Sequence, residues 1–376
     1  MTTKLSILIP TWKRYPGLYR NLLYINYLLT SGNWRLFFSQ VEFIIADGTP
    51  VGFDPEKCYP LLLALIEKLQ ASINLVYLHA PEQTYLARIA LLASKSTSRY
   101  VMVVGDDDLI VPNYLLECVD FLDSNIRFKC VAGRQINILG FSGNSLKFDD
   151  SDRFFYGASV TVDNCIGRFI QYQTLNMVGC PSLYYAIQAR ELLSNFARLC
   201  GDKESELFYG GLELIHQTLT LKEGFVKLSN LPTVLRDFTY LNYFVEEERV
   251  APSSDAYPYY GIGAVRIVAS LLKDTSGFNQ HCKDPFGLLD SIFNASAEIL
   301  PSQQRVRGNL NSQLVQQNLL QLIPLETCSL AFRVWRETLV LRYGPNSKST
   351  LGFKDSFILR FLVDLRSRFL AYLKAS

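Results

Sequence analysis

Residues 100–108 of the chain are Tyr100-Val101-Met102-Val103-Val104-Gly105-Asp106-Asp107-Asp108. An uninterrupted apolar run is followed, after one glycine, by three consecutive carboxylates. Such a run predicts a strand that is buried on both faces, as in the parallel sheets of α/β proteins. Ligands of these open sheets bind just beyond the carboxyl ends of the strands. The three aspartates are therefore predicted to lie at the mouth of a site.

The chemistry of the triplet suits a metal ion. Carboxylates are hard oxygen ligands of the kind that Mg²⁺ and Mn²⁺ prefer, and Gly105 lets the backbone turn sharply and a ligand approach closely. The alternative is a solvated acidic turn in which Asp108 only caps the following helix. The triplet alone does not distinguish between these interpretations. The surrounding sequence is needed to choose between them.

The composition excludes several classes of protein. Hydrophobic residues make up 49% of the 376 residues, which is enough for a large core and excludes a wholly disordered chain. The net charge of +2 argues against a nucleic-acid-binding protein, which needs a strong basic field. The eight cysteines are scattered without a C-x-x-C pair, which indicates a reducing compartment, and three distant histidines argue against a zinc cluster.

We expect a cytoplasmic protein, in peripheral contact with the inner face of the membrane at most. No cleavable signal precedes the first predicted strand, and no apolar run is long enough to span a bilayer. The segment for membrane contact is 357–374, which has aromatic and aliphatic residues on one broad face with arginines and lysines around it. Docking of this terminal helix on its own domain is the favoured alternative.

Strands and helices alternate along the first third of the chain. Strands are predicted at 5–9, 41–46, 75–78 and 100–104, with helices at 17–29, 61–69, 84–93 and 112–122. Pro10 is expected to end the first strand, and Thr84 to cap the third helix. This alternation predicts a doubly wound, mostly parallel sheet.

The alternation ends after Cys130, and the predicted elements change in kind. They are a hairpin from 131–138 and 145–148, helices at 188–199 and 206–222, and a short strand at 225–228. Residues 232–236 are expected to leave the core. A polar break at 246–255 is the predicted linker.

Two domains follow from this division. The first covers residues 1–245, with a nucleotide-binding half at about 1–112 and an acceptor half at about 113–245. The second, 256–376, is predicted to be a mainly helical C-terminal extension.

Three short motifs follow the predicted strands in a fixed order. The first strand ends in Pro10-Thr11-Trp12-Lys13-Arg14, the second in Asp47-Gly48-Thr49, and the strand at 100–104 in Gly105-Asp106-Asp107-Asp108-Leu109-Ile110-Val111-Pro112. This order resembles the family-2 type of inverting nucleotide-sugar glycosyltransferases, which have the GT-A fold. In that family the acidic motif is normally D-x-D-D-x-x-x-P, so Gly105 replaces the first aspartate here.

A second block also resembles this family, and the resemblance then covers about residues 4–240. Its members are Ser182-Leu183-Tyr184-Tyr185, Arg190-Glu191, Gly201-Asp202, Glu213, Gly224, Pro232 and Arg236. The catalytic base of the family is normally an aspartate in an acidic pair. Leu212-Glu213 occupies the matching position, so glutamate takes the place of aspartate.

The resemblance implies a metal-dependent, inverting transferase that moves a sugar from a UDP- or GDP-linked donor to a glycan or a lipid-linked acceptor. Asp107 and Asp108 would hold the Mg²⁺ or Mn²⁺ ion that stabilises the departing diphosphate. The residues implied in nucleotide binding are Pro10, Thr11, Arg14, Asp47, Arg88 and Asp106.

Inverting transfer needs one general base beside the acceptor hydroxyl. Glu213 is the candidate because Gly210 and Gly211, just before it, permit close approach of a substrate; Asp202 and Glu206 are held in reserve. A solvated helix carboxylate is the alternative for Glu213. His216, one turn further on, is expected to be a packed or solvated histidine without a catalytic role.

The nucleotide-binding candidates also have plainer interpretations. Asp47 precedes a glycine and would form a turn, Arg14 would be an ordinary exposed arginine, and Arg88 would belong to a surface ion pair. Two other functions stay open. A nucleotidyltransferase also uses acidic metal ligands, but the loop at 10–14 lacks its usual glycines, and a degenerate GT-A module would serve as a scaffold.

Overall fold

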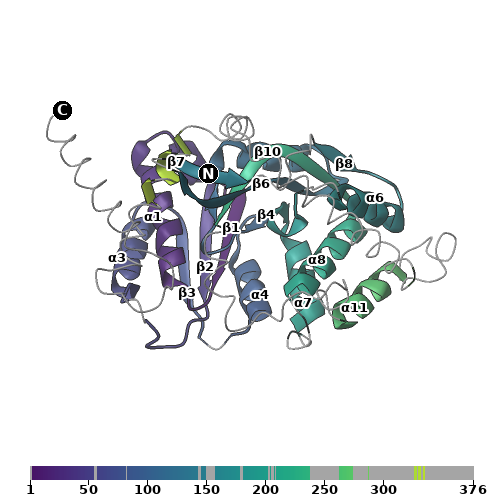
Figure 1. Ribbon diagram of the computed structural model, residues 1–376, viewed down its shortest axis with the longest axis horizontal. Coiled ribbons are helices and arrows are strands. Elements are labelled where there is room, and N and C mark those ends of the chain that lie inside the picture. Colours follow the sequence, from purple (N-terminus) through teal and green to yellow (C-terminus); the bar gives the residue numbers. More distant parts are fainter. Residues whose placement is uncertain are drawn as a thin grey trace.

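The computed structural model describes residues 2–54, 57–81, 83–142, 145–149, 157–177, 181–201, 204, 207, 209–237 and 262–273, together with 287, 326–327, 329–331 and 333–334. These residues form one mixed sheet with helices on both faces (Figure 1). The predicted α/β class is therefore confirmed. The predicted linker at 246–255, the terminal helix at 357–374, Asp202 and Glu206 lie outside the described residues.

Four parallel strands form the first half of the sheet, and each follows a predicted apolar run. They are β1 (Leu5–Thr11), β2 (Val41–Asp47), β3 (Leu75–His79) and β4 (Tyr100–Val103), in the spatial order β3-β2-β1-β4. Figure 1 shows α1 (Tyr15–Ser31) and α3 (Tyr59–Gln70) on one side of these strands and α4 (Tyr85–Lys95) on the other. Thr84 caps α4 as predicted, since its hydroxyl accepts a hydrogen bond from the Ala87 amide.

Burial on both faces explains why these strands are apolar throughout. Ile7 and Phe43 belong to the core under α1, α3 and α5 (Leu115–Ser124). Their neighbours Leu8 and Ile44 belong to the core on the opposite face, under α4. A strand covered on one face only would alternate between apolar and polar residues.

The chain reverses its direction of winding beside β1. From β1 it passes to β2 and β3, and then returns so that β4 lies on the other side of β1. Leu8 pairs with Val103, and the Val104 amide donates to the Leu8 carbonyl at 2.9 Å. The ends of β1 and β4 are therefore adjacent at the topological switch point, where open α/β sheets bind their ligands.

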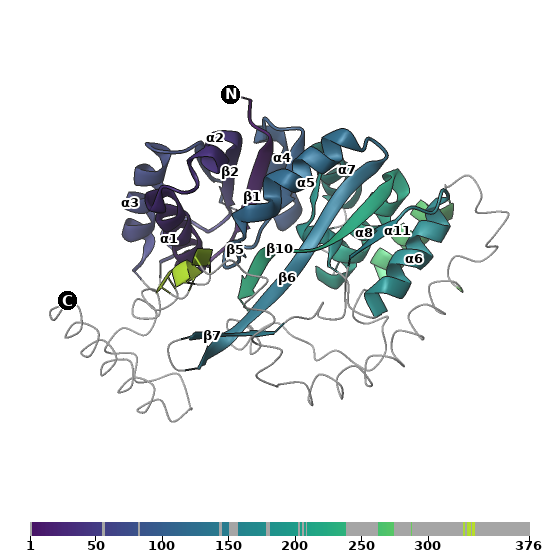
Figure 2. The ribbon, with the colours of Figure 1, turned by 90° about the horizontal axis from the view of Figure 1, so that it is seen from above.

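The second half of the sheet is mixed. Its strands are β9 (Ile187–Ala189), β6 (Phe128–Ser142), β10 (Phe225–Asp237), β5 (Leu109–Ile110), β7 (Ser145–Asp149) and β8 (Ala158–Val160). β9 is antiparallel to both β4 and β6, whereas β6 and β10 are parallel to each other. Figure 2 shows β6 extending to its antiparallel partner β7, so the predicted hairpin is confirmed.

Two proline-based predictions are wrong. Residues 232–236 do not leave the core but continue β10, where Val234 and Leu235 are fully buried. Register irregularities on both sides of Pro232 accommodate its missing amide hydrogen. Pro10 likewise does not end β1: pairing with β4 stops at Leu8, and Pro10 pairs with β2 alone.

Four helices cover the second face beside α4. They are α6 (Cys165–Met177), α7 (Arg190–Cys200), α8 (Tyr209–Glu223) and α11 (Ile262–Lys273). The other three all contact α8, and their buried residues join one apolar cluster. The part of the predicted C-terminal domain that forms α11 therefore packs on the first domain, and the boundary itself stays a prediction.

The remaining short elements are α2 (Arg35–Gln40), η1 (Pro112–Tyr114) and η2 (Leu183–Tyr185). None of the helices in the described part of the chain combines the length and the apolar character needed to cross a bilayer. The described cysteines are buried free thiols: Cys58, Cys118, Cys130, Cys165 and Cys200.

Candidate functional site

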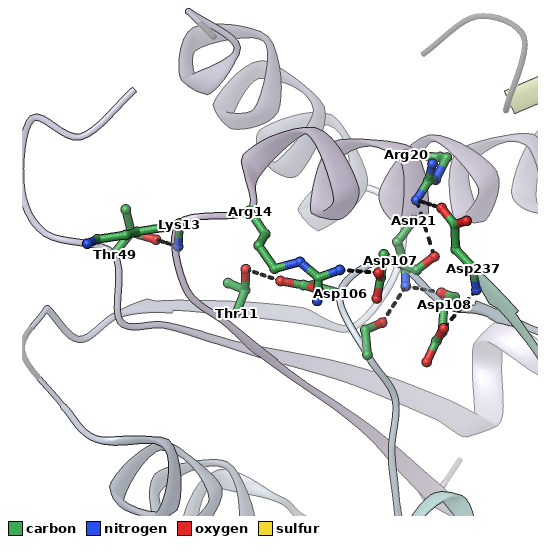
Figure 3. A network of polar contacts seen from close by, with 11 residues as sticks. Thr11, Lys13, Arg14, Arg20, Asn21, Thr49, Asp106, Asp107, Asp108 and Asp237 are labelled. Atoms are coloured by element: carbon green, nitrogen blue, oxygen red, sulfur yellow. Dashed lines mark hydrogen bonds and ion pairs between the residues drawn. The ribbon is translucent and has the colours of Figure 1, made fainter. Parts of the chain in front are cut away.

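The predicted site residues Thr11 and Asp106 meet across the switch point. The Thr11 hydroxyl, at the end of β1, donates to Oδ2 of Asp106 at 2.7 Å (Figure 3). Asp106 comes just after β4, and its side chain is almost completely buried. This bond joins the first motif to the acidic motif and shows that the ends of β1 and β4 are in direct side-chain contact.

Gly105 makes room for two carboxylates. A Cβ atom built on Gly105 would lie 2.7 Å from Oδ2 of Asp108 and 3.1 Å from Oδ1 of Asp107. Both oxygens therefore converge on the space that the missing side chain leaves. A side chain at position 105 would push both carboxylates out of this arrangement.

Burial of this cluster makes its negative charges costly. Burial raises the pKa of Asp106 to about 6, with Asp107 adding to the rise and Arg14 opposing it. Burial raises the pKa of Asp108 to about 7, again with Asp107 adding to it, while Arg236 opposes. Like charges in a dry site favour either a bound proton or a bound cation.

Arg14 supplies one cationic partner. Its Nη1 lies 2.9 Å from Oδ1 of Asp106, and its Nη2 forms an ion pair with Oδ2 of Asp107 (Figure 3). The preceding residue, Lys13, has a φ of 55°, in the left-handed region that few side chains adopt. The Lys13 amide donates to the Thr49 hydroxyl at 2.8 Å. This turn, fixed by the hydrogen bond to Thr49, connects β1 to Arg14 at the start of α1.

A second set of polar residues holds the acidic turn from α1 and β10. The buried side chain of Arg20 forms an ion pair with Asp237, and the Asp237 amide donates to Oδ1 of Asp108 at 3.1 Å. The side-chain amide of Asn21 donates to the backbone carbonyl of Asp108 at 2.5 Å and to that of Gly105 at 3.3 Å. The turn is therefore braced on both sides.

Sequence reasoning missed Arg20, Asn21 and Asp237. The first two were detectable as consecutive polar residues on the apolar helix between Leu18 and Leu22, both of which are fully buried. Asp237 gave no signal of its own, because the strand that carries it was predicted to end earlier.

The donor set fits a divalent cation in part. Mg²⁺ is commonly bound by one or two carboxylates together with waters and substrate phosphates, and Asp107 and Asp108 offer two converging oxygens. In the described ranges, no three or more His, Cys, Asp or Glu side chains are grouped so that they could hold an ion. The phosphates of a ligand would have to complete such a site.

Asp47 forms a turn in this structure. Its side chain is fully buried, with Oδ1 accepting from the Thr49 amide at 2.8 Å and Oδ2 accepting from the Tyr77 hydroxyl at 2.6 Å. Burial, together with this bond to Asp47, raises the pKa of Tyr77. Asp47 thus shapes the β2 turn, and a contact between its carboxylate and a nucleobase stays a prediction.

Arg88 is not in a surface ion pair. Its side chain is buried, and Nη1 donates to the Gln83 carbonyl at 2.6 Å. A Cβ atom on Gly48 would lie 2.1 Å from the same nitrogen, so a side chain there would force the guanidinium to move. Burial lowers the pKa of Arg88, and within the described ranges no carboxylate oxygen lies within 4 Å of its guanidinium. A buried cation in this state suits an anionic ligand.

The candidate base Glu213 shares one charged neighbour, Arg236, with the acidic turn. Glu213 is on α8, and burial raises its pKa while Arg236 opposes the rise. Arg236 also lowers the pKa of Asp108, so its charge acts on both carboxylates. Its guanidinium lies 4.8 Å from the centre of the Tyr185 ring. A fully solvated carboxylate, the alternative for Glu213, does not match this partly buried position.

His216 is packed, which is one of the two states expected for it. It is fully buried, its Nε2 lies 2.9 Å from Oε1 of Gln188, and its ring contacts those of Tyr184 and Phe196. Burial lowers the pKa of His216 to about 3, which keeps the imidazole neutral near pH 7. It belongs to the core that supports α8.

A cavity of about 230 Å³ lies among residues that follow β2, the last residue of β3 and the starts of α1 and α3. Its lining residues are Tyr15, Pro50, Val51, Gly52, Phe53, Asp54, Tyr59 and His79. Tyr15, the neighbour of Arg14, stacks on Tyr59 with 4.8 Å between ring centres. Two stacked tyrosines therefore line this cavity, next to the turn that carries Arg14.

Comparison with known proteins assigns no family. No family model matches the chain, and no curated protein matches it. Among solved structures, S. aureus TarS 1–349 is 14% identical over 91% of this chain and 86% of that one, with a TM-score of 0.47. Its complex with UDP-GlcNAc is 16% identical over 91% and 87%, and its complex with UDP 13% over 93% and 95%, both with TM-scores of 0.45. A similarity this low does not establish an activity.

Proposed function

We propose that this chain is a metal-dependent, inverting nucleotide-sugar glycosyltransferase of the GT-A type. It would move a sugar from a UDP- or GDP-linked donor to a glycan or a lipid-linked acceptor. One observation carries the proposal: carboxylate oxygens of Asp107 and Asp108 converge beside the Thr11–Asp106 bond, at the switch point of a doubly wound sheet. Ligands of such sheets bind at this place.

The acidic motif and Arg88 would both act on the diphosphate of the donor. Asp107 and Asp108 would hold an Mg²⁺ or Mn²⁺ ion, which when bound would neutralise the diphosphate that leaves the sugar. Asp106, fixed by Thr11, contributes the third carboxylate at the strand end. Arg88 offers a buried guanidinium without a carboxylate in contact among the described residues, which suits the negative charge of the diphosphate.

Glu213 would act as the general base, with Asp202 in reserve. The acceptor hydroxyl oxygen forms the new bond to the anomeric carbon while its proton passes to the Glu213 carboxylate. The bond from the anomeric carbon to the diphosphate breaks, and its electron pair leaves with the diphosphate. The pKa of Glu213, raised by burial, makes it a stronger base than a solvated carboxylate.

A binding module without catalysis is the second candidate. The observation that favours it is the contact of Arg14 with both Asp106 and Asp107, which already satisfies two of the three carboxylates. Such a module would bind no nucleotide in a metal-dependent manner, so the two candidates make opposite predictions for the same titration.

Isothermal titration calorimetry with UDP and with GDP, each with and without Mn²⁺, tests the proposal. We expect at least one nucleotide to bind, and to bind more tightly with Mn²⁺. Asp107→Asn should remove this dependence on the metal. Asp163→Asn, the same change on an exposed aspartate paired with Arg127, is the matched control. If neither UDP nor GDP binds, the result would favour the module without catalysis.

Catalysis needs a separate measurement. Slow hydrolysis of UDP-sugars or GDP-sugars without an acceptor should be detectable in the unmodified protein and lost in Asp107→Asn. Glu213→Gln should lower the rate of transfer while nucleotide affinity stays unchanged. Retained affinity with no turnover in the unmodified protein would contradict the enzymatic part of the proposal.

A further inference from the structure

The side chain of Asp107 lies between two positive partners, one present and one proposed. Its Oδ2 pairs with Arg14, and its Oδ1 faces the space over Gly105, where Oδ2 of Asp108 also converges. Arg14 additionally reaches Oδ1 of Asp106 at 2.9 Å. The guanidinium therefore covers Asp106 and Asp107, and Asp107 is also a proposed ligand of the divalent cation.

Both positive groups cannot hold Asp107 equally well at the same time. A divalent cation on Oδ1 draws negative charge away from Oδ2, and it repels a guanidinium a few ångströms away. Burial strengthens this repulsion, because the effective dielectric constant inside a protein is lower than in water. Arg14 and the cation should therefore compete for the carboxylates.

Arg14 is the arginine here that is placed to move. Its side chain is 29% exposed, and it precedes the first residue of α1 in the turn after β1. Arg20 has a side chain that is only 4% exposed and is paired with the equally buried Asp237. Arg88 is buried and hydrogen-bonded to the Gln83 carbonyl.

We propose that Arg14 is an exchangeable counter-ion: it neutralises Asp106 and Asp107 before a divalent cation binds, and it moves to the diphosphate of the donor when the cation takes its place. This inference rests on the proposed function. Arg14 is then a positioning and binding residue whose partner changes during the cycle. Its planar guanidinium has two parallel donors, which match phosphate oxygens as well as carboxylate oxygens.

The exchange has a consequence for the order of binding. Before the cation arrives, Asp106 and Asp107 hold the guanidinium, so it is not available to the diphosphate. After the cation binds, both the cation and the released Arg14 attract the diphosphate. The cation and the nucleotide should therefore bind with positive coupling, each raising the affinity for the other.

Direct titration of Mn²⁺ in the absence of nucleotide tests the exchange without reference to activity. We expect Arg14→Gln to bind Mn²⁺ about tenfold more tightly than the unmodified protein, because the competitor is gone. Arg14→Lys, which keeps the charge but cannot span two carboxylates, should lie between them. Arg99→Gln, the same change on an exposed arginine near Asp123, is the control and should not alter the affinity.

The effect of Arg14→Gln on nucleotide affinity should be opposite to its effect on Mn²⁺ affinity. Arg14→Gln should weaken UDP binding in the presence of saturating Mn²⁺, although it strengthens Mn²⁺ binding alone. A crystal structure with Mn²⁺ and UDP should show the Arg14 guanidinium separated from Asp107. A guanidinium that still contacts both Asp106 and Asp107 in that structure would overturn the exchange.

The failure of this inference differs from the failure of the proposed function. Equal Mn²⁺ affinities for the unmodified protein and Arg14→Gln would overturn the exchange and leave a metal-dependent transferase in place. No binding of Mn²⁺ by any variant, with or without UDP, would overturn both. Thermal melting of each variant, compared with the unmodified protein, excludes unfolding as the cause.

Discussion

The carboxylate of Glu204 accepts a hydrogen bond from the backbone amide of Leu86 at 3.0 Å, although 118 positions separate the two residues in the sequence. Leu86 is in the first turn of α4, the helix that carries Arg88. A carboxylate at a helix N-terminus satisfies a free amide and interacts favourably with the helix dipole. Glu204 therefore ties the segment before α8 to the helix that presents the buried guanidinium.

Removal of the Glu204 carboxylate should affect both stability and nucleotide binding. We expect Glu204→Ala to lower the free energy of unfolding by about 1 kcal/mol, the usual value of a helix cap, and to weaken UDP binding severalfold because α4 and Arg88 lose a support. Chemical denaturation and calorimetry measure the two effects. Glu191→Ala, in the first turn of α7, is the control. Unchanged UDP affinity in Glu204→Ala would refute the link to Arg88.

Replacement of Arg88 should separate stability from binding. A buried charge with no carboxylate in contact among the described residues is costly to the fold. We expect Arg88→Met to raise the free energy of unfolding of the ligand-free protein by about 1 kcal/mol. The same change should weaken UDP binding by about tenfold to a hundredfold, the usual range for a hydrogen bond to a charged group. A loss of stability together with full UDP affinity would assign Arg88 a structural role only.

His216 should make the protein less stable in acid. In the unfolded chain the imidazole titrates near its ordinary pKa of about 6.5, whereas burial lowers the pKa of His216 to about 3 in the fold. Between these values the unfolded state binds a proton that the folded state excludes, so this residue's contribution to stability is complete above pH 6.5 and falls as the pH falls toward 3. The slope approaches about 1.4 kcal/mol per pH unit for one proton.

His216→Gln isolates this effect from other titrating groups. The glutamine stays neutral at every pH and its polar end can still face Gln188, so the variant lacks the loss of stability that His216 causes in acid. The difference in unfolding free energy between the two proteins should therefore shrink as the pH falls from 6.5 to 4.5. Parallel stability curves over that interval would show that His216 does not titrate in this way.

The buried ion pair of Arg20 and Asp237 should be costly to break on one side. Asp237→Asn leaves the Arg20 guanidinium, only 4% exposed, without its charged partner. We expect a loss of about 3–5 kcal/mol, and a smaller loss when Arg20→Met is combined with Asp237→Asn, because no unpaired charge then remains. Urea denaturation of Asp237→Asn, Arg20→Met and the double variant measures this. Additive losses in the double variant would argue against direct coupling of the pair.

The parallel half of the sheet was predictable because its signals are local. The apolar runs at β1, β2 and β4 can be buried only between two layers of helices, so their composition specifies a doubly wound arrangement. The acidic triplet follows one of these runs directly, which places it at a strand end whatever the rest of the chain does. Thr11 and Asp106 could therefore be assigned to one site before any contact was known.

The second half of the sheet depended on distant partners. Pro232 reads as the end of a strand in isolation, yet β6 on one side and β5 on the other keep β10 in the sheet through an irregular register. Irregular pairing of this kind depends on the neighbouring strands and leaves no periodic pattern in the sequence. The prediction failed there because tertiary pairing outweighed the local signal.

The sequence by itself determined the α/β class and the run of carboxylates after β4, since both follow from local hydrophobicity and residue type. Only the tertiary structure decided that Arg14 covers Asp106 and Asp107, that Arg20 and Asp237 brace the turn, and that Glu204 caps α4. These contacts join residues that are about 90 to 220 positions apart. Their partners are chosen by the packing of whole elements, which no single stretch of sequence encodes.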